Sequence, residues 1–214
     1  SSELCDMPSC FSRNPDLYAK RTILAKKLKM LPYEFIVRGH IFGSMWKEYK
    51  TSGSFCGRQI ENKYELAQKL ETPIITPSAK NSSGHDEYIS LERLKKEIGS
   101  KEADAICSIC LNLYETCYQE ALKKGIIIGD TKFEFGYDED GELVLGDEIF
   151  TPDSSRFWAL PDWKIGASPK SYDKQFVRDW LTQHKMNGVT PAPEIPEDVI
   201  RKTAAIYKEC YCKL

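Results

Sequence analysis

Residues 126–136 show the pattern that most restricts the fold of this chain, because their side chains alternate between two faces with a period of two. In a strand, this period places three charged side chains on one face: Asp130, Lys132 and Glu134. A second strand-like segment, residues 143–150, follows after Asp140-Gly141, the strongest two-residue hairpin signal in the sequence. The sequence therefore predicts an antiparallel hairpin with one charged face.

A two-residue turn would fix the register of this hairpin. Glu139 would flank Glu142, and Glu134 would lie directly opposite Asp147, on the face of Lys132. Opposed carboxylates repel each other, so in a cleft this pair would need a cation. A Mg²⁺ ion held by one or two carboxylates and by phosphate oxygens would meet that need. The solvated outer face of an ordinary hairpin explains the pattern equally well, and a register slip of one residue would turn Asp147 to the opposite face.

The remaining patterns predict an α+β fold. Strands are expected within residues 21–41, with a break near Pro32, and helices at 45–50, 90–98, 101–124, 171–184 and 196–212. Residues 71–88 and 151–170 are rich in turn-forming residues and are expected to be loops, the first long enough to be functional. The longest helix has an expected buried stripe of Ala103, Cys107, Cys110, Tyr114, Cys117 and Ala121. These elements predict an antiparallel sheet with helices packed on one face.

Composition and charge exclude several classes of protein. The 214 residues carry a formal net charge of -2, which gives no electrostatic footprint for general binding to nucleic acid or to anionic membranes. Apolar runs such as residues 126–128 are far shorter than the roughly 20 residues of a membrane span, and no leader for secretion is recognisable. The 8 cysteines are too sparse for a disulfide scaffold. We therefore expect a cytoplasmic protein with reduced thiols.

Two further segments have the chemistry of anion sites. Gly43-Ser44 precede a helical stretch, and the free N–H groups of a helix start can bind a phosphate, although an ordinary helix cap explains the same residues. In residues 151–158, the hydroxyl of Ser155 is next to Arg156, whose forked donors suit a phosphate. A surface turn is the simpler explanation of that second segment.

Several blocks of residues follow one another in a recognisable order. They read LPYEFIVRG (31–39), GSMWKEY (43–49), TPSAK (76–80), GHDE (84–87), DTKFEFG (130–136), GDE (146–148), TPDSSRFW (151–158) and DKQFVRDW (173–180). From about residue 24 onward, nearly the whole chain resembles the phosphoribosylaminoimidazole-succinocarboxamide synthase family, also called SAICAR synthetase.

The resemblance implies an ATP-dependent ligase of purine biosynthesis. In this family, ATP phosphorylates the carboxylate of carboxyaminoimidazole ribotide, and the amino group of L-aspartate then displaces phosphate from the acyl phosphate. The products are the succinocarboxamide ribotide, ADP and phosphate. The implied cofactors are ATP and Mg²⁺. The implied partners are these small molecules, with no nucleic acid and no membrane, and no oligomeric state follows.

The resemblance also implies roles for individual residues. Glu134 and Asp147 would hold the metal, Lys132 would stabilise negative charge during phosphoryl transfer, and Asp130 would orient Lys132 or a metal-bound water. The implied substrate-binding residues are Arg38, Ser44, Asp86, Ser155, Arg156, Lys174 and Arg178. Of these, Arg38, Ser44 and Arg156 would bind chiefly the phosphate of the ribotide.

The family has two lobes, in a plan similar to that of ATP-grasp enzymes or kinases. Residues 1–32 would be a remnant of the N-terminal ATP-binding lobe with the interlobe linker, and most of that lobe would be absent. Residues 33–214 would form the C-terminal domain that binds substrate and metal. Phe42 departs from the family pattern, which usually has a small residue before Gly43-Ser44.

Three other interpretations stay open from the sequence. The chain could be an inactive fragment that binds a ligand, a kinase for a small molecule, or an interaction module stabilised by zinc. Cys107 and Cys110 could serve such a module, but their place on the expected apolar stripe favours a core role. His85 precedes Asp86 in the long loop and could contact substrate. Aspartate-dependent release of phosphate separates a ligase from a kinase.

Overall fold

The computed structural model describes residues 1–60, 63–81 and 86–214. Within them the chain forms two compact units, one made of Ser1–Leu31 and Phe135–Gly146, the other of Pro32–Glu134 and Asp147–Leu214. The sequence placed a boundary after residue 32 but did not group the hairpin at 135–146 with the N-terminal segment. The interpretation of residues 1–32 as the remnant of a lobe stays a prediction.

The first unit contains short elements. They are the 3₁₀-helix η1 (Leu4–Asp6), helices α1 (Ser9–Ser12) and α2 (Pro15–Tyr18), and strands β1 (Lys29–Met30) and β8 (Leu143–Gly146), both paired with the end of β7 (Ile126–Tyr137). The expected strand before Pro32 is wrong over residues 21–28. Those residues join no strand, and the apolar side chains of Ile23 and Leu24 are exposed.

The hairpin between β7 and β8 closes differently from the predicted two-residue turn. The N–H of Asp138 donates to the carbonyl of Glu142 at 3.1 Å, and the carboxylate of Asp138 accepts from the N–H of Glu142 at 2.9 Å. The predicted pairing of Glu139 with Glu142 is therefore wrong by one residue. Strand β8 also ends at Gly146 instead of residue 150, because the backbone of Asp147 turns to φ 58°.

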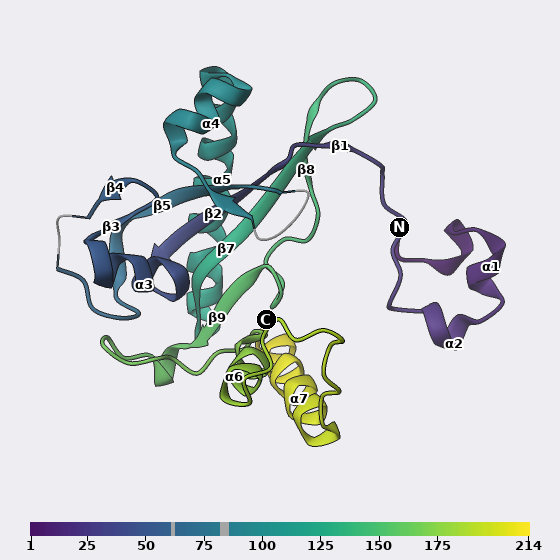
Figure 1. Ribbon diagram of the computed structural model, residues 1–214. Helices are drawn as coiled ribbons and strands as arrows, with labels where there is room; N and C mark the ends of the chain where they lie inside the picture. The colour runs from purple at the N-terminus through teal and green to yellow at the C-terminus, as the bar shows by residue number, and fades with distance from the viewer. Residues whose placement is uncertain (61–62, 82–85) are drawn as a thin grey trace. The chain divides into compact units, whose positions relative to one another are not determined.

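The second unit is built on an antiparallel sheet (Figure 1). Strand β2 (Tyr33–His40) lies between β5 (Lys69–Ala79) and β7, with β6 (Glu87–Tyr88) beside β5 and β9 (Ser155–Ala159) beside β7. A separate hairpin joins β3 (Ser54–Phe55) to β4 (Arg58–Gln59). The predicted α+β class with an antiparallel sheet is confirmed.

Two segments predicted as loops form strands instead. Residues 69–79 pair with β2 along β5, where Pro77 lies opposite Phe35, although Pro lacks an N–H and normally argues against a central strand. Residues 155–159 pair with β7 along β9, with Trp158 opposite Ile127. In both segments, burial of the side chains in the sheet outweighs the turn-like composition. The part of the predicted loop that includes His85 lies outside the described residues.

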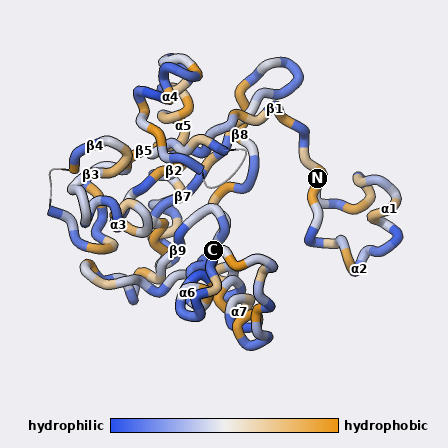
Figure 2. Tube along the Cα trace, viewed as in Figure 1, coloured by the Kyte–Doolittle hydropathy of each residue, from blue (hydrophilic) through white to orange (hydrophobic). Residues whose placement is uncertain are grey.

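The helices follow the predicted pattern closely. They are α3 (Gly43–Ser52), α4 (Leu91–Ile98), α5 (Ser100–Lys123), the 3₁₀-helix η2 (Leu160–Asp162), α6 (Gln175–Gln183) and α7 (Glu197–Lys213). Helix α3 ends at Gly53 in the left-handed conformation, and α4 begins at Ser90, whose hydroxyl accepts from the N–H of Arg93 at 3.2 Å. In Figure 2 the tube of α4 changes between hydrophilic and hydrophobic along its length, as in a helix with one buried face.

Helix α5 packs against one face of the sheet. Its buried side chains are Ala103, Ile106, Cys110, Tyr114, Tyr118 and Ala121. Cys107 and Cys117 are only half-buried, so the predicted stripe is wrong at those positions and runs through Ile106 and Tyr118 instead. The hydroxyl of Tyr114 donates to the carbonyl of Ile128 at 2.6 Å, beside Gly39, where a Cβ would lie 2.0 Å from that hydroxyl. The face of β2 that meets α5 is therefore apolar and closely packed, which leaves the opposite face to the polar residues.

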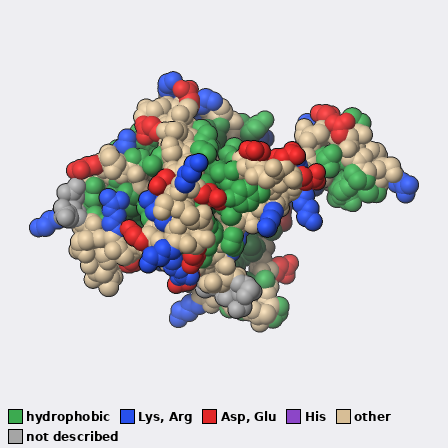
Figure 3. Space-filling model, turned by 90° about the horizontal axis from the view of Figure 1, so that it is seen from above, with side chains coloured by type: hydrophobic (Ala, Val, Ile, Leu, Met, Phe, Trp, Pro, Cys, Tyr) green, Lys and Arg blue, Asp and Glu red, His purple; other side chains and the backbone are tan. Residues whose placement is uncertain are grey.

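Two surface features bear on the exclusions made from composition. On the face shown in Figure 3, basic and acidic side chains are interspersed. Within the described residues, no helix is both long enough and apolar enough to cross a membrane.

Candidate active site

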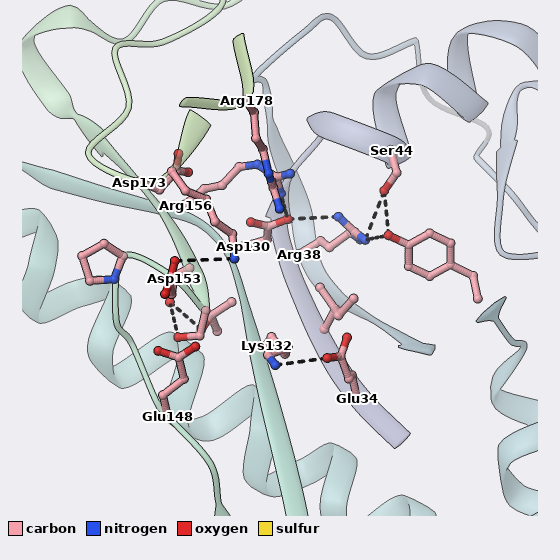
Figure 4. Close-up of a pocket in the computed structure, with 17 residues that line it drawn as sticks. Glu34, Arg38, Ser44, Asp130, Lys132, Glu148, Asp153, Arg156, Asp173 and Arg178 are labelled. Carbon is pink, nitrogen blue, oxygen red and sulfur yellow. Dashed lines mark hydrogen bonds and ion pairs between the residues drawn. The ribbon is translucent and has the colours of Figure 1, made fainter. Parts of the chain in front are cut away.

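A cavity of about 300 Å³ opens on the polar face of β2 and β7, opposite the face that meets α5 (Figure 4). Its walls come from β2, β7, β9, the start of α3, strand β6, the turn before β9 and the start of α6. The lining residues are Glu34, Ile36, Arg38, Ser44, Tyr88, Asp130, Thr131, Lys132, Glu148, Pro152, Asp153, Ser154, Ser155, Arg156, Asp173, Lys174 and Arg178. Eight of the nine residues expected from the sequence to bind substrate or act in catalysis line this cavity, and Asp86 is the exception.

One end of the cavity is organised around Asp130, and we call it the arginine end. Arg38 lies opposite Asp130 in the register of β2 and β7, and its Nη1 donates to Asp130 Oδ2 at 3.0 Å. Arg156, from β9, donates to the same oxygen. The charge of Asp130 raises the pKa of Arg156, so the guanidinium stays charged although it is largely buried. Figure 4 shows Arg38, Arg156 and Arg178 converging around this carboxylate.

Arg38 is held on every side. Its Nε donates to Thr76 Oγ1 at 3.0 Å, and its guanidinium carbon lies 4.9 Å from the ring centre of Phe55 and 5.6 Å from that of Tyr88. Its Nη2 faces Ser44 Oγ at 3.5 Å and the Tyr88 hydroxyl at 3.3 Å. The orientation of this guanidinium is therefore set by the protein before any ligand arrives.

Ser44 does not act as the cap of α3. Phe42 holds the cap position without a side-chain hydrogen bond, and the Ser44 hydroxyl instead meets the Tyr88 hydroxyl at 2.9 Å. The ordinary-cap explanation of Gly43-Ser44 is wrong, and the serine hydroxyl lies in the wall of the cavity.

Arg156 rests against the start of α3. Its guanidinium carbon lies 5.6 Å from the ring centre of Phe42, and a Cβ on Gly43 would come within 2.7 Å of its Nη2. Gly43 also has φ 60°, a conformation that favours glycine. Within the described part of the chain, the buried Nε of Arg156 has no hydrogen-bond partner. The absence of a side chain at Gly43 therefore makes room for the guanidinium, and the Nε of Arg156 is a donor that the described residues leave unused.

Hydroxyl groups line the wall between the two ends of the cavity. Thr131 Oγ1 meets Ser155 Oγ at 2.8 Å, and Ser155 Oγ lies 3.4 Å from Ser154 Oγ. The turn of residues 151–154 is closed by its own side chains: Thr151 N–H donates to Ser154 Oγ at 3.1 Å, and the Thr151 hydroxyl donates to Glu148. The segment is therefore a rigid approach to β9 and not an irregular surface turn.

The other end of the cavity centres on Lys132, and we call it the lysine end. Lys132 Nζ lies 3.1 Å from Glu34 Oε1, 2.8 Å from Glu134 Oε1 and 3.3 Å from Asp147 Oδ2. Glu134 also pairs with Lys80, at the end of β5. Burial opposes the charged form of Lys132, but its hydrogen bonds to Glu134 and Glu34 outweigh burial and raise its pKa.

Asp147 reaches this cluster by a route that the sequence did not predict. It follows β8 instead of lying within it, and its φ of 58° carries the side chain back to Lys132. Partial burial acts to raise the pKa of Asp147, but the hydrogen bond and the charge of Lys132 outweigh it, so the pKa is lowered. The predicted gathering of Glu134, Asp147 and Lys132 is therefore present, although the predicted ladder register is wrong.

The lysine end has the donor chemistry of a site for Mg²⁺. Glu134 and Asp147 offer hard oxygen ligands around one position where the structure already places a cation, the Lys132 ammonium. Among the described residues, no three of the side chains His, Cys, Asp and Glu approach closely enough to hold a metal ion on their own. The residues therefore fit an ion that takes two protein carboxylates and completes its shell with phosphate and water oxygens, as Mg²⁺ does.

Helix α6 contributes the third wall. Lys174 and Arg178 line the cavity, and Lys174 Nζ lies 3.6 Å from Asp153 Oδ1. Asp173 is buried beside them and accepts from the N–H of Gln175 at 2.6 Å. Burial raises the pKa of Asp173. Asp86 is not among the lining residues; it is exposed and accepts a long hydrogen bond from the N–H of Asn81, at 3.4 Å.

Several site residues were missed by the sequence reasoning. Glu34 lies two residues before Ile36 on the cavity face of β2, so the period of two could have found it. Lys80 and Tyr88 lie within residues 71–88, which were interpreted as a loop, and Asp173 lies among the polar residues before α6. Asp130 was expected to orient Lys132 or a water, but its described side-chain partners are Arg38 and Arg156.

Comparisons with known proteins identify the family. The SAICAR synthetase family model matches residues 3–194. The chain is 48% identical to the phosphoribosylaminoimidazole-succinocarboxamide synthase of Lachnospira eligens, over 99% of this chain and 72% of that protein. It is 49% identical to the enzyme of the same name from Methylibium petroleiphilum, over 91% of this chain and 67% of that protein. The chain belongs to the SAICAR synthetase family.

Solved structures agree with this assignment. A SAICAR synthase from Saccharomyces cerevisiae, complexed with SAICAR, superposes with a TM-score of 0.87 at 42% identity, over 99% of this chain and 70% of that one. A type-2 SAICAR synthetase in complex with ADP gives a TM-score of 0.63 at 26% identity, over 96% of this chain and 76% of that one. The expected fold and the expected activity are confirmed: the chain is an ATP-dependent SAICAR synthetase, a ligase of purine biosynthesis that joins carboxyaminoimidazole ribotide and L-aspartate. The kinase and zinc-module alternatives gain no support.

Proposed function

We propose that the two ends of the cavity divide the work of the ligase. The arginine end binds the phosphate of carboxyaminoimidazole ribotide through Arg38, Ser44 and Arg156, with the Ser155 hydroxyl on the same wall. The lysine end serves phosphoryl transfer from ATP to the substrate carboxylate. The observation that carries this proposal is that one carboxylate oxygen, Asp130 Oδ2, holds two guanidinium groups at the cavity wall.

The charge balance at the arginine end supports an anionic ligand. Four basic side chains line this end, Arg38, Arg156, Lys174 and Arg178, against the three carboxylates of Asp130, Asp153 and Asp173, which leaves one positive charge in excess. Buried charges are stable only when they are paired, so a dianionic phosphate at this position completes the site. Asp130 acts here as a positioning residue, because it fixes both guanidinium groups and does not itself face a reacting atom.

Lys132 is proposed to act on the transferred group. Its ammonium is fixed by Glu34, Glu134 and Asp147, and its raised pKa keeps it protonated at neutral pH. A fixed positive charge at this place stabilises negative charge on the phosphoryl group and on the acyl phosphate. Attack by the amino group of L-aspartate on that acyl phosphate then forms the amide bond and releases phosphate.

Glu134 and Asp147 are proposed to hold Mg²⁺. When bound, this ion supplies charge neutralisation for the phosphate oxygens of ATP. The protein's own part is to keep Asp147 ionised, which the ammonium of Lys132 does by lowering the pKa of Asp147 against the effect of burial.

The remaining residues are proposed for roles at the edge of the cavity. Lys174 and Arg178 line the wall beside the arginine end and suit the carboxylates of a substrate. Asp86, two residues before Tyr88 in the chain, is proposed to contact substrate at the rim of the cavity. Residues 1–32 are proposed to belong to the ATP-binding lobe and the linker. A cytoplasmic location is also proposed, and the free cysteines among the described residues support it.

Binding of the ribotide tests the arginine end directly. Calorimetric titration of the protein with the ribotide should show that Arg156→Lys weakens binding by about tenfold or more. Lysine keeps the positive charge but lacks the paired N–H donors of the guanidinium. Arg201→Lys is the matched control, since Arg201 on α7 is 79% exposed and pairs with Glu197 of the same helix at 2.9 Å. Equal affinities of the two variants would refute the assignment of Arg156.

A further inference from the structure

Tyr88 reaches the arginine end from a strand that the sequence did not predict. It lies on β6, paired with Ser78 of β5, and its side chain is 39% exposed in the wall of the cavity. Its hydroxyl lies 2.9 Å from Ser44 Oγ and 3.3 Å from Arg38 Nη2. The phenol therefore contacts both Arg38 and Ser44, two of the residues to which phosphate binding is assigned above.

The direction of these hydrogen bonds leaves the phenol proton available. A guanidinium only donates, so Arg38 Nη2 must donate to the Tyr88 oxygen. The hydroxyl of Tyr88 can then give its own proton to Ser44 or to a ligand. A hydroxyl that accepts from a cation becomes a stronger donor, because hydrogen bonds in a chain polarise one another.

The other donors of Arg38 face away from Tyr88. Nε is directed to Thr76 at 3.0 Å, and Nη1 to Asp130 at 3.0 Å. Nη2 is therefore the nitrogen that Arg38 presents toward Ser44 and Tyr88. A ligand that reaches Nη2 and the Ser44 hydroxyl comes within reach of the Tyr88 hydroxyl as well.

The ring of Tyr88 is fixed independently of its hydroxyl. It lies 5.6 Å from the guanidinium carbon of Arg38 and 5.3 Å from the ring of Phe55, with a 60° angle between the two ring planes. These contacts need only the aromatic ring, and phenylalanine would keep them. The structural role of the ring and the donor role of the hydroxyl can therefore be separated by one substitution.

We propose that Tyr88 is a further donor of the phosphate site, acting beside Arg38 and Ser44 to recognise the phosphate monoester of the ribotide. This inference rests on the proposed function, because it needs the phosphate to bind at the arginine end. It adds a residue that selects the phosphorylated substrate over the corresponding riboside, which has a neutral hydroxyl in place of the dianion.

The test compares ligands with and without the phosphate. The protein, Tyr88→Phe and Tyr211→Phe are titrated by calorimetry with the ribotide and with its dephosphorylated riboside. Tyr211 is the matched control because its side chain is 83% exposed on α7. We expect Tyr88→Phe to weaken binding of the ribotide by about tenfold, the value of one charge-assisted hydrogen bond, and to leave binding of the riboside unchanged.

Three outcomes overturn the inference. Unchanged binding of the ribotide to Tyr88→Phe would mean that the hydroxyl does not contact the phosphate. Tighter binding would mean that the hydroxyl competes with the ligand for Ser44 and Arg38. An equal loss for ribotide and riboside would mean a structural role. Arg38→Lys separates this inference from the proposed function: if that variant binds the ribotide as the parent does, the phosphate site itself is wrong, whereas a loss there without one in Tyr88→Phe rejects only Tyr88.

Discussion

The arginine end and the lysine end of the cavity carry net charges of opposite sign. At the arginine end, two guanidinium groups converge on a single oxygen of Asp130, and rings and hydroxyls fix their orientation. At the lysine end, the carboxylates of Glu34, Glu134 and Asp147 surround one ammonium. The first end has an excess of positive charge and the second an excess of negative charge, although both lie on the same face of β7.

The difference teaches what each end requires from a ligand. The arginine end is rigid and nearly complete, so it needs an anion of defined shape and little rearrangement. The lysine end is more open, with side-chain exposures of 26% for Lys132 and 40% for Asp147, which suits the Mg²⁺ proposed to bind there. In the proposed function, binding of the ribotide depends on the preorganised guanidinium groups of the arginine end, whereas phosphoryl transfer depends on the cations at the lysine end.

Removal of a carboxylate from the lysine end should have the largest effect. We expect Glu134→Ala or Asp147→Ala to lower Mg²⁺-dependent turnover by about 10³-fold or more, because the neutralisation of phosphate charge is lost. Aspartate-dependent release of phosphate measures this turnover. Glu142→Ala, in the exposed hairpin, is the control and should keep normal rates. Near-normal turnover in the Glu134 and Asp147 variants would remove the distinction between the two ends.

Asp130→Asn tests whether the arginine end depends on one buried carboxylate. The substitution removes the carboxylate that Arg38, which is 2% exposed, shares with Arg156. We expect the free energy of unfolding to fall by about 3–5 kcal/mol, as when one partner of a buried pair is removed. Urea denaturation measures this change. Asp104→Asn, which breaks the surface pair with Lys95, should cost about 1 kcal/mol or less; a similar loss in both variants would contradict the prediction.

The sequence predicted the two ends to different degrees. Period-two alternation alone placed Asp130, Lys132 and Glu134 on one face, because a strand fixes side-chain direction locally. The family blocks then placed Arg38, Ser44 and Arg156 at the cavity, where the structure has them. Tyr88 and Lys80 could not be found from local pattern. Strand β6 is recognisable only from its pairing with β5, and β5, which ends just before Lys80, only from its pairing with β2.

Asp147 shows why a correct grouping can rest on a wrong geometry. The predicted ladder pair needed a two-residue turn, but the turn closes on Asp138 and Glu142. A positive φ at Asp147 then returns its side chain to Lys132. Non-glycine residues adopt this conformation rarely, so no propensity argument would have proposed it. Residue types indicated the chemistry of the lysine end, but only the tertiary structure gives its backbone path.

The pH dependence of stability should show whether buried His40, which packs behind the rings next to the arginine end, is held in its neutral form. His40 lies 5.2 Å from the ring of Trp158, which in turn contacts Phe42, the ring beneath Arg156. Burial, with help from the charge of Lys69, lowers the pKa of His40 to about 4 from 6.5. The folded state therefore favours neutral His40, and this stabilisation is complete above pH 6.5 and is lost as the pH falls toward 4.

The measurement is the free energy of unfolding in urea across that window. We expect His40 to contribute a loss on the order of 3 kcal/mol between its unfolded and folded pKa values. His40→Phe should flatten this part of the pH profile, whereas His184→Gln, at an exposed position at the end of α6, should not. A profile that His40→Phe leaves unchanged would show that His40 is not held in its neutral form.

Gly43→Ala should have the smallest effect and gives the finest test of the rigidity of the arginine end. The added Cβ would lie 2.7 Å from Nη2 of Arg156, so the guanidinium must move away from the position that Asp130 and Phe42 define. The backbone at φ 60° adds a strain of about 1–2 kcal/mol for any residue with a Cβ. Gly57→Ala separates these two effects, because Gly57 has φ 73° with nothing within 4 Å of its Cβ position. Both variants should lose similar stability in urea, but only Gly43→Ala should weaken ribotide binding, by about threefold to tenfold in calorimetry. If Gly43→Ala binds the ribotide as tightly as Gly57→Ala does, Arg156 can shift without loss, and the arginine end is as adaptable as the lysine end.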